Sequence, residues 1–411
     1  MGKQYLDLPI PPADPAFSLM ADFEADSHPD KVSLIAGAYR DENGNPWALP
    51  SVRKAKARLS ECTHEYSGIA GSPTFNTLAK ELIFGPLTPA LKGNTASIQT
   101  VSGTGANHLA ASFLARHLRP ARVFIPAQTW INHRSIWTMA GVPVAEYPYY
   151  SSATKSVDFP CMLSALSTAE PNDVVILQAC AHNPTGVDLS RSQWIQVAAL
   201  VARKGLFVVF DSAYQGFATG DVDGDAWVVR YFTENILASE AERKTQTHAG
   251  LCVAQSFSKN FGLYGERVGA LHLVVPPHLS AAGARGELMA IARTEYSNPP
   301  RFGARIVEAV LGDSELRVQW EKDLETMSAR IRKMRQELRR RLEEETGLNW
   351  SFVETQIGMF SYTGLVKEQV ARLREEFHVY LLTSGRLSVC GLNEGNVRYV
   401  AHAIGEVVKT T

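Results

Sequence analysis

The most reactive feature of the sequence is a lysine in an apolar setting. Lys259 follows the apolar run 251–254 and lies in the stretch QSFSKN. Desolvation lowers the pKa of an amine, and an uncharged amine can attack an aldehyde. Arg267 comes eight residues later, and its guanidinium is suited to hold a phosphate in the same pocket. These residue types predict a lysine nucleophile beside an anion site.

A glycine-rich turn offers a second group of anion ligands. The residues SGTGA, starting at Ser102, follow the apolar run 98–101 and open a predicted helix. A helix N-terminus presents free N–H groups and about half a positive charge, so a phosphate would fit there. Two alternatives stay open. The turn could serve packing only, or it could bind a dinucleotide, although His108 replaces the third glycine of that fingerprint and no P-loop Lys-Ser/Thr follows.

Further polar and aromatic residues follow the predicted strands at their carboxyl ends, where open parallel sheets bind ligands. Asp211 ends the apolar run 206–210, and a buried aspartate requires a cationic partner. Trp130 and Asn183 lie in similar loops, in the stretches QTWINH and AHNPTG. Asp211 could instead cap a helix, and Trp130 could be a core aromatic residue. Neither residue alone decides between these interpretations.

A common framework must bring these loops to one edge. Seven short apolar, β-branched runs alternate with helical patterns between residues 98 and 275. This alternation predicts an α/β fold whose large domain contains a mostly parallel seven-stranded sheet between helices. The runs are 98–101, 123–125, 142–147, 174–177, 206–210, 251–254 and 268–275.

The last third of the chain has a different pattern. From Trp320 to Glu345, apolar residues recur at three- and four-residue spacing, which predicts a long amphipathic helix. Its arginines alternate with glutamates, so a solvated helix face is a better interpretation than a nucleic-acid site. Further elements are expected as strands over 352–362 and 379–382 and as a closing helix over 396–408.

The length of the chain suggests two domains, and its composition suggests no nucleic-acid or membrane partner. A chain of 411 residues is too long for one ordinary core, and we predict a large domain over 46–310 and a smaller α+β domain over 1–45 and 311–411. The chain has 41 basic and 42 acidic side chains and no apolar run near the about 20 residues of a membrane span, so we expect neither nucleic acid nor a membrane as partner. The five cysteines are scattered without a CxxC pair, which indicates no metal site and a reducing, cytoplasmic location.

Nine stretches, in order, resemble the class I aminotransferases of the aspartate aminotransferase type. The resemblance runs from Pro12 to the C-terminus. The stretches are AGAYR from Ala36, HEY from His64, SGTGA from Ser102, AHNPTG from Ala181, DSAYQ from Asp211, QSFSKN from Gln255, SNPP from Ser297, GMF from Gly358 and SGR from Ser384. Nine matches in order leave little room for chance.

The resemblance implies pyridoxal 5'-phosphate as the cofactor. Lys259 would carry the cofactor and move a proton between the substrate α-carbon and the cofactor's C4′. Asp211 would pair with the pyridine nitrogen, which makes the ring an electron sink, and Trp130 would stack on the ring. Tyr214 and Asn183 would hydrogen-bond the phenolic oxygen. The phosphate would be held by Ser102, Gly103, Thr104, Ser256, Arg267 and Tyr66 of the partner subunit. A homodimer is therefore implied.

Two arginines set the implied substrate. Arg386 would grip the α-carboxylate through a two-bonded fork, assisted by Asn183, Trp130 and the backbone of Gly37. Arg293 of the partner subunit would bind a side-chain carboxylate. Either arginine alone could be a surface charge, but their spacing to SNPP and SGR favours a site. The implied reaction is transamination between L-aspartate, or a similar dicarboxylic amino acid, and 2-oxoglutarate, giving oxaloacetate and L-glutamate.

Three features depart from the family pattern. Gln178 stands where histidine is usual, in a chain that runs through His133 towards Asp211, and glutamine cannot carry a charge. Ile35 replaces a usual glycine near the substrate, and the polar stretch 238–249 is expected to form a surface loop. These departures keep open an aromatic or specialised-metabolite aminotransferase, or another α-carbanion reaction on the same scaffold. A non-catalytic binder disagrees with the complete set of site residues.

Overall fold

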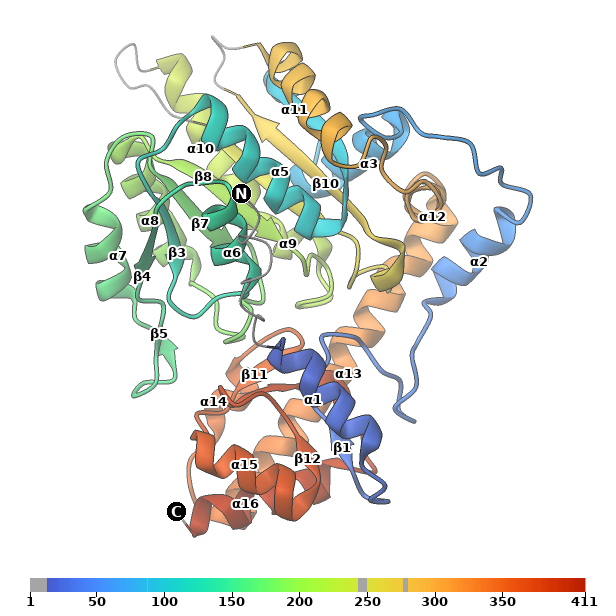
Figure 1. Ribbon diagram of the computed structural model, residues 1–411, viewed down its shortest axis with the longest axis vertical. Coiled ribbons are helices and arrows are strands. Elements are labelled where there is room, and N and C mark those ends of the chain that lie inside the picture. Colours follow the sequence, from blue (N-terminus) through green and yellow to red (C-terminus); the bar gives the residue numbers. More distant parts are fainter. Residues whose placement is uncertain (1–12, 87, 243–249, 276–279, 411) are drawn as a thin grey trace, which may run out of the picture.

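The protein has two lobes (Figure 1). The computed structural model describes residues 13–86, 88–242, 250–275 and 280–410. The upper lobe contains a sheet with helices on both faces, and the lower lobe joins the N-terminal helix α1 (Pro15–Ala25) to the C-terminal elements. We keep the predicted domain boundaries near residues 46 and 310 as a proposal.

The upper lobe is built on a seven-stranded sheet of order β2-β10-β9-β8-β7-β3-β4. β10 runs antiparallel to β2 and β9, and all other pairs are parallel, so the predicted mostly parallel sheet is confirmed. β10 is antiparallel to β9 because no α-helix separates the two strands, whereas a parallel pair requires a long crossover. The strands are β2 (Thr95–Val101), β3 (Val123–Pro126), β4 (Val144–Tyr147), β7 (Val174–Gln178), β8 (Phe207–Ser212), β9 (Leu251–Ser256) and β10 (Val268–Val274).

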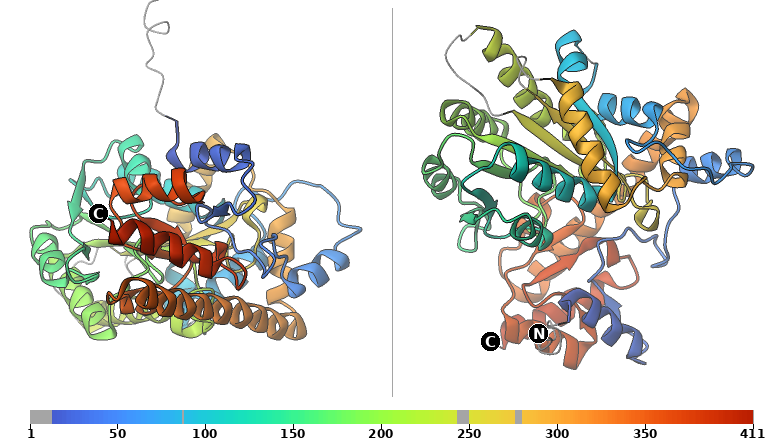
Figure 2. Two further views of the ribbon diagram at one scale, coloured as in Figure 1. Left: turned by 90° about the horizontal axis from the view of Figure 1, so that it is seen from below. Right: turned by 45° about the horizontal axis from the view of Figure 1, so that its top comes forward.

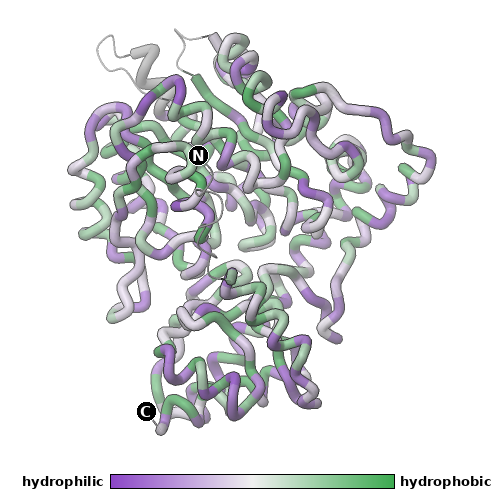
Figure 3. Tube along the Cα trace, viewed as in Figure 1, coloured by the Kyte–Doolittle hydropathy of each residue, from purple (hydrophilic) through white to green (hydrophobic). Residues whose placement is uncertain are grey.

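Both faces of the sheet are buried. In β7, Val175 and Leu177 belong to one apolar cluster, and Val174 and Ile176 belong to another, because successive side chains of a strand point to opposite faces. The strands at the centre are mainly hydrophobic in Figure 3. The first cluster includes residues of α7 (Phe159–Ser167), α8 (Arg191–Lys204) and α10 (Trp227–Glu242), and the second includes residues of α5 (Ser102–His117), α6 (Asn132–Met139) and α11 (Ala281–Glu295).

The lower lobe contains two small sheets that join distant parts of the chain. β1 (Val32–Ser33) pairs in parallel with β12 (Val379–Tyr380), and β11 (Phe360–Tyr362) pairs antiparallel with β13 (Arg386–Ser388). The first pairing holds the N-terminal segment against the C-terminal third. The helices of this lobe are α14 (Ser351–Thr355), α15 (Lys367–Phe377) and α16 (Val397–Lys409).

The helix α13 (Ser314–Thr346) connects the two lobes (Figure 1), and the view from below in Figure 2 shows it along its length. It packs against α2 (Pro50–Arg58) and α12 (Phe302–Leu311) in the upper lobe and against α14 and α16 in the lower lobe. The helix predicted over 320–345 is present and starts earlier, because the side chain of Asp313 caps its first turn.

Two predictions about local structure are wrong in part. The strand predicted over 352–362 is helical in its first part, because Trp350 and Val353 are both buried at the three-residue spacing of a helix and only β11 is extended. The loop predicted over 238–249 begins too early, since α10 continues to Glu242, and residues 243–249 lie outside the described part of the chain. The strand near 379–382 and the closing helix are present as β12 and α16.

Short elements complete the chain. They are α3 (Pro73–Phe84), α4 (Pro89–Asn94), α9 (Val222–Asp225), β5 (Tyr150–Ser151), β6 (Ser156–Val157) and the 3-10 turns η1 (Tyr264–Glu266) and η2 (Val389–Gly391). Across the described ranges, no helix has the length and apolar character that crossing a membrane requires.

Candidate active site

A cavity of about 200 Å³ lies at the carboxyl ends of β7, β8 and β9. Open parallel sheets bind ligands at this edge. The lining residues are Ser102, Gly103, Thr104, Trp130, Gln178, Asn183, Asp211, Ala213, Tyr214, Ser256, Ser258, Lys259, Tyr264 and Arg267. The cavity thus brings together every predicted catalytic and cofactor residue except Tyr66.

The end of the cavity beside α5 is shaped for an anion. Ser102, Gly103 and Thr104 form the first turn of α5, and all three line the cavity. Gly103 lies so close to β9 that a Cβ added there would stand 2.8 Å from the Cβ of Ser256. Arg267 makes no ion pair within the part of the chain that the structure describes, although it donates to a main-chain carbonyl. Free N–H groups and an unpaired guanidinium fit a phosphate.

Four residues of the predicted motifs hold a left-handed backbone. Ser102, Ala181, Arg267 and Ser297 have φ values of 65°, 50°, 53° and 67°. This conformation is costly for residues with a side chain, and such residues gather at functional sites. The N–H of Ser102 donates to the carbonyl of Arg267 at 3.0 Å, so two of these residues hold the anion end together.

Asp211 lies inside β8, so the alternative of a helix cap is wrong. Its Oδ2 lies 3.0 Å from Nε2 of His133, and both residues are buried. Nδ1 of His133 lies 2.8 Å from the hydroxyl of Thr129, which accepts from the amide of Gln178 at 3.3 Å. The expected chain from Gln178 through His133 to Asp211 is therefore present, with Thr129 as an additional link.

Lys259 is half-buried beside the ring of Tyr214. Its Nζ lies 5.5 Å from the centroid of that ring. Burial lowers the pKa of the Lys259 amine, although the charge of Asp211 acts in the opposite direction. Burial also raises the pKa of the Tyr214 hydroxyl, and the charge of Asp211 adds to this effect. The site therefore favours an uncharged amine, which is the nucleophilic form.

Arg386 belongs to β13 of the lower lobe. Its Nη2 donates to the carbonyl of Ile35 at 2.9 Å, and its guanidinium lies 4.1 Å from the centroid of the Phe360 ring. Nε is buried and has no hydrogen-bond partner among the described residues. An unpaired buried donor is costly, so this arginine fits a carboxylate ligand. Gly37 adjoins it, since a Cβ added there would stand 3.0 Å from the Phe360 ring.

An outer cleft of about 600 Å³ connects Arg386 with the inner cavity. Trp130 and Asn183 line both spaces. Phe17 of α1 and Tyr362 of β11 line the outer cleft only. A ligand that contacts Lys259 and a ligand that contacts Arg386 would therefore lie in one continuous site, and α1 lines the outer side of that site.

Tyr66 and Arg293 lie apart from this site. They line a separate surface pocket of about 790 Å³ beside the SNPP stretch. Tyr66 is 88% exposed, and Nη1 of Arg293 donates to the hydroxyl of Ser297. Asn298 ties the two segments together, because its Nδ2 donates to the carbonyl of Ser67 at 2.6 Å. One chain alone does not bring either residue to the cavity, which agrees with the expectation that they serve a partner's site.

Several residues near the site were not predicted, and three of them make contacts that shape it. Tyr264 lines the cavity, and its hydroxyl accepts from the N–H of Tyr39 at 2.9 Å. Phe360 lies against the guanidinium of Arg386, and Thr129 completes the chain to Asp211. Phe360 ends the matched stretch GMF, and Thr129 stands one helical turn before a histidine, so both had a signal in the sequence. Tyr264 had none, because its contact with residue 39 depends on the fold.

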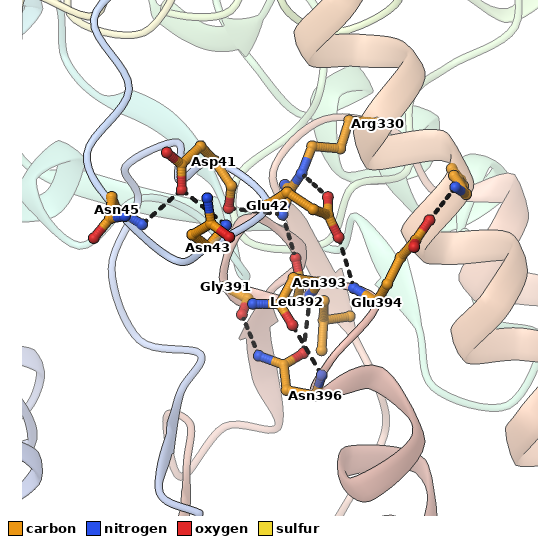
Figure 4. Close-up of polar contacts among 11 residues, drawn as sticks. Asp41, Glu42, Asn43, Asn45, Arg330, Gly391, Leu392, Asn393, Glu394 and Asn396 are labelled. Carbon is orange, nitrogen blue, oxygen red and sulfur yellow. Dashed lines mark hydrogen bonds and ion pairs between the residues drawn. The ribbon is translucent and has the colours of Figure 1, made fainter.

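A polar cluster fixes the segment that follows Gly37 (Figure 4). Nε of Arg330, on α13, donates to the carboxylate of Glu42 at 2.9 Å, and Nη2 donates to two main-chain carbonyls at 3.2 and 2.7 Å. Glu42 also accepts from the N–H of Glu394 at 2.7 Å. Helix α13 thereby holds the backbone near Gly37 in place.

The half-buried lysine, its aspartate neighbour and a helix N-terminus suited to an anion, all at one sheet edge, fit the site of an aminotransferase. The model of the family described as aminotransferase class I and II matches residues 29–404. The chain belongs to this family, and the resemblance seen in the sequence is confirmed.

Individual relatives cover almost the whole chain. An L-tyrosine:2-oxoglutarate aminotransferase of Aspergillus ustus is 45% identical over 409 residues, which are 96% of this chain and 76% of that protein. The cytoplasmic aspartate aminotransferase of Saccharomyces cerevisiae is 43% identical over 97% of this chain and 95% of its own length, and its solved structure matches with a TM-score of 0.94 over 100% of both chains. An aromatic-amino-acid aminotransferase from Burkholderia pseudomallei, covalently bound to pyridoxal phosphate, matches with a TM-score of 0.91 at 41% identity over 98% of this chain and 99% of that one.

Proposed function

We propose that this aminotransferase uses pyridoxal 5'-phosphate to exchange the amino group between L-aspartate and 2-oxoglutarate, giving oxaloacetate and L-glutamate. The observation that carries this function is the single cavity in which Lys259, Asp211 and the N-terminus of α5 meet. The similarity to the yeast aspartate aminotransferase, over nearly the full length of both chains, supports the same substrates.

The cavity residues fit the cofactor from end to end. Asp211 would bind the pyridine nitrogen, Asn183 and Tyr214 the phenolic oxygen, and Trp130 would cover the ring. The phosphate would be held by Ser102, Gly103, Thr104, Ser256 and Arg267. When bound, pyridoxal phosphate supplies an electron sink for the negative charge that forms at the substrate α-carbon.

The chain's own residues would bind the substrate and move its proton. Arg386 would bind the α-carboxylate from the outer cleft that it lines and so fix the α-carbon above the cavity. Lys259 would take the proton from that carbon, and burial lowers the pKa of its amine, which favours the uncharged form that accepts a proton. The N-terminal helix α1 lines the outer side of the cleft with Pro15, Ala16 and Phe17.

A homodimer completes the proposed site. Tyr66 of the partner subunit would reach the phosphate, and Arg293 of the partner subunit would bind the side-chain carboxylate of aspartate. The exposure of Tyr66 and its position beside Arg293, in a pocket separate from Lys259, support this arrangement. We assign the enzyme to the cytoplasm, as the yeast relative is cytoplasmic.

Transamination of an aromatic amino acid is the second candidate. Its support is the tyrosine aminotransferase of Aspergillus ustus together with the apolar side chains of the outer cleft, which include Phe17, Ile131 and Tyr362. An aromatic substrate would be stabilised by burial against these side chains, whereas a second carboxylate would not.

A panel of amino donors tests both candidates. The purified protein is expected to be yellow, and aspartate should convert its absorbance to that of the amine form faster than tyrosine, cysteine or alanine. If tyrosine does so and aspartate does not, the dicarboxylate specificity is wrong. A colourless protein that takes up no added pyridoxal phosphate would overturn the enzyme function.

Reversing the charge of Arg293 tests the side-chain pocket. Arg293→Asp should reduce kcat/KM for aspartate more than about a hundredfold and create activity with a basic donor such as arginine, because the pocket then attracts the opposite charge. Arg285→Asp is a matched control, since Arg285 is an exposed residue of the same helix outside this pocket. Unchanged aspartate kinetics in Arg293→Asp would place that arginine outside the site.

A further inference from the structure

One neutral side chain, Gln178, joins two walls of the cavity. Its Oε1 accepts from the N–H of Asn183 at 2.8 Å, and its Nε2 donates to the carbonyl of Asn183 at 2.9 Å. A main-chain N–H only donates and a carbonyl only accepts, so these two bonds leave a single orientation for the Gln178 amide. The second hydrogen of Nε2 then points to the hydroxyl oxygen of Thr129, 3.3 Å away.

This orientation fixes the hydrogen of the Thr129 hydroxyl. The oxygen accepts from Gln178 and must donate its own hydrogen to another group. Among the described residues, the only other partner of this hydroxyl is Nδ1 of His133, at 2.8 Å. Nδ1 is therefore the acceptor, and a neutral imidazole carries its hydrogen on the other nitrogen.

The chain of donors ends at Asp211. The Nε2–H of His133 points to Oδ2 of Asp211 at 3.0 Å. His133 is 1% exposed and Asp211 is 8% exposed, so bulk water competes little with this bond. The ring of Trp130 meets the ring of His133 edge-on, with centroids 5.3 Å apart, which limits rotation of the imidazole. Gln178, Thr129 and His133 each donate a hydrogen bond to the next group on the way to Asp211.

We infer that Gln178 is a positioning residue that acts through Thr129 to hold His133 as the neutral tautomer with its hydrogen on Nε2. One N–H is thereby aimed at Oδ2 of Asp211, which leaves Oδ1, without a hydrogen-bond partner among the described residues, to face a cation. The effect of that carboxylate on a pyridine nitrogen rests on the proposed function, but the tautomer of His133 does not. A titratable side chain at position 178 could reverse the direction in which these hydrogen bonds are donated, whereas glutamine cannot.

The tautomer can be observed directly by nuclear magnetic resonance. Long-range 1H–15N spectra are recorded on the full-length protein labelled in its 11 histidine rings, before and after addition of pyridoxal phosphate. The signals of His133 are assigned by their absence in His133→Gln. We expect a protonated Nε2 and an unprotonated Nδ1 in both states. A hydrogen on Nδ1, or on both nitrogens, would overturn the inference.

Reversing the polarity at one atom tests the role of Gln178. Gln178→Glu is nearly isosteric but replaces the donor that faces Thr129 and the carbonyl of Asn183 by an acceptor, so the Thr129 hydroxyl should turn towards Glu and Nδ1 of His133 should gain a hydrogen. Thr129→Val removes the donor to Nδ1, so Nδ1 should gain a hydrogen in part of the molecules, and Thr129→Ser should restore the single form. A contact that only stabilises the fold would not move the tautomer in this pattern.

Each outcome decides one question. If Nδ1 of His133 stays without a hydrogen in both Gln178→Glu and Thr129→Val, Gln178 does not set the tautomer and the inference is wrong. If the tautomer follows the expected pattern but the wild-type protein binds no pyridoxal phosphate, the inference stands and the proposed function fails. If the inference and the proposed function both hold, Thr129→Val should bind the cofactor about tenfold more weakly. This is the factor expected for weakening one hydrogen bond to a charged group.

Discussion

At the scale of residues, three ionisable side chains that are buried or half-buried lie around one site. Lys259 and Asp211 line the inner cavity, and Arg386 has a buried nitrogen without a partner. Groups of this kind are costly to bury, and the cost is offset only when ligands pair with them. Function and stability should therefore respond in opposite directions when such a group is removed.

Lys259→Met should abolish transamination, by more than about a thousandfold, and yet raise the Tm of the cofactor-free protein. The pKa of Lys259 is lowered by burial from its ordinary value of 10.5, so the unfolded chain binds more protons than the folded one. The wild type should therefore gain stability relative to the variant as pH rises towards 10.5, and the difference in Tm should shrink. Differential scanning calorimetry across this pH range measures it. A lower Tm for the variant at neutral pH would contradict the cost assigned to the buried amine.

Gly103→Ala should weaken cofactor binding without unfolding the protein. The added Cβ would stand 2.8 Å from the Cβ of Ser256, so the N-terminus of α5 must move away from β9, at a cost of about 1–3 kcal/mol. Gly105→Ala is the matched control in the same turn, because its nearest neighbour lies 3.4 Å away. Fluorescence titration with pyridoxal phosphate compares the two variants. Equal affinities would show that close packing at residue 103 does not shape the anion site.

Sequence reasoning found most of the site residues because each stands at the end of a strand. Lys259, Asp211 and Asn183 were predicted from strand ends and matched stretches, and all three line one cavity. Tyr264 was not predicted, because its contact with Tyr39 joins two residues that are 225 positions apart in the sequence. The unpaired Nε of Arg386 also depends on the folded neighbourhood and has no counterpart in the sequence.

At the scale of elements, the apolar runs located all seven strands of the large sheet, because buried parallel strands are continuous apolar segments. The same rule failed at α14, where a short apolar segment is helical. Apolar runs of this length fit either a strand or a helix, and the burial of residues three positions apart indicates the helix. The antiparallel direction of β10 also depends on the connection rather than on the strand's own residues.

The helix α1 has no buried residue, so few apolar contacts hold it in place. Asp26 anchors its C-terminal end, accepting from Nδ1 of His378 and from the hydroxyl of Tyr380, each at 2.7 Å. The main-chain N–H of His28 and the Tyr380 hydroxyl lower the pKa of Asp26, so this anchor is present above the ordinary pKa of 3.8 and is lost only in stronger acid.

Asp26→Ala should therefore speed amide hydrogen exchange in α1 and raise KM for the amino donor several-fold, because Phe17 of this helix lines the outer cleft. The value of kcat should change less, since no contact of Asp26 reaches the inner cavity. Asp22→Ala is the control one turn earlier, where the side chain is largely exposed. Identical exchange in both variants would show that Asp26 does not anchor the helix.

At the scale of the whole molecule, the proposed site is incomplete in one chain. Lys259 lines the inner cavity, whereas Arg293 and the exposed Tyr66 line a different surface pocket. The sequence pointed to a dimer only through its resemblance to a family, because no pattern within one chain specifies a contact between two. The structure of one chain shows in addition that Tyr66 and Arg293 line the same surface pocket.

Mixed dimers test whether the site is shared. Lys259→Met and Arg293→Asp, each inactive alone with aspartate, are coexpressed with different tags. In a mixed dimer with shared sites, one site contains both changes and the other contains neither. Random pairing should then restore about a quarter of the wild-type activity, because half of the dimers are mixed and each has one intact site of two. If Arg293 serves its own chain, both sites of every mixed dimer carry one change, and no activity should return. Purification through both tags isolates the mixed dimers, which in the aspartate assay should then have about half of the wild-type activity if the sites are shared and none if they are not.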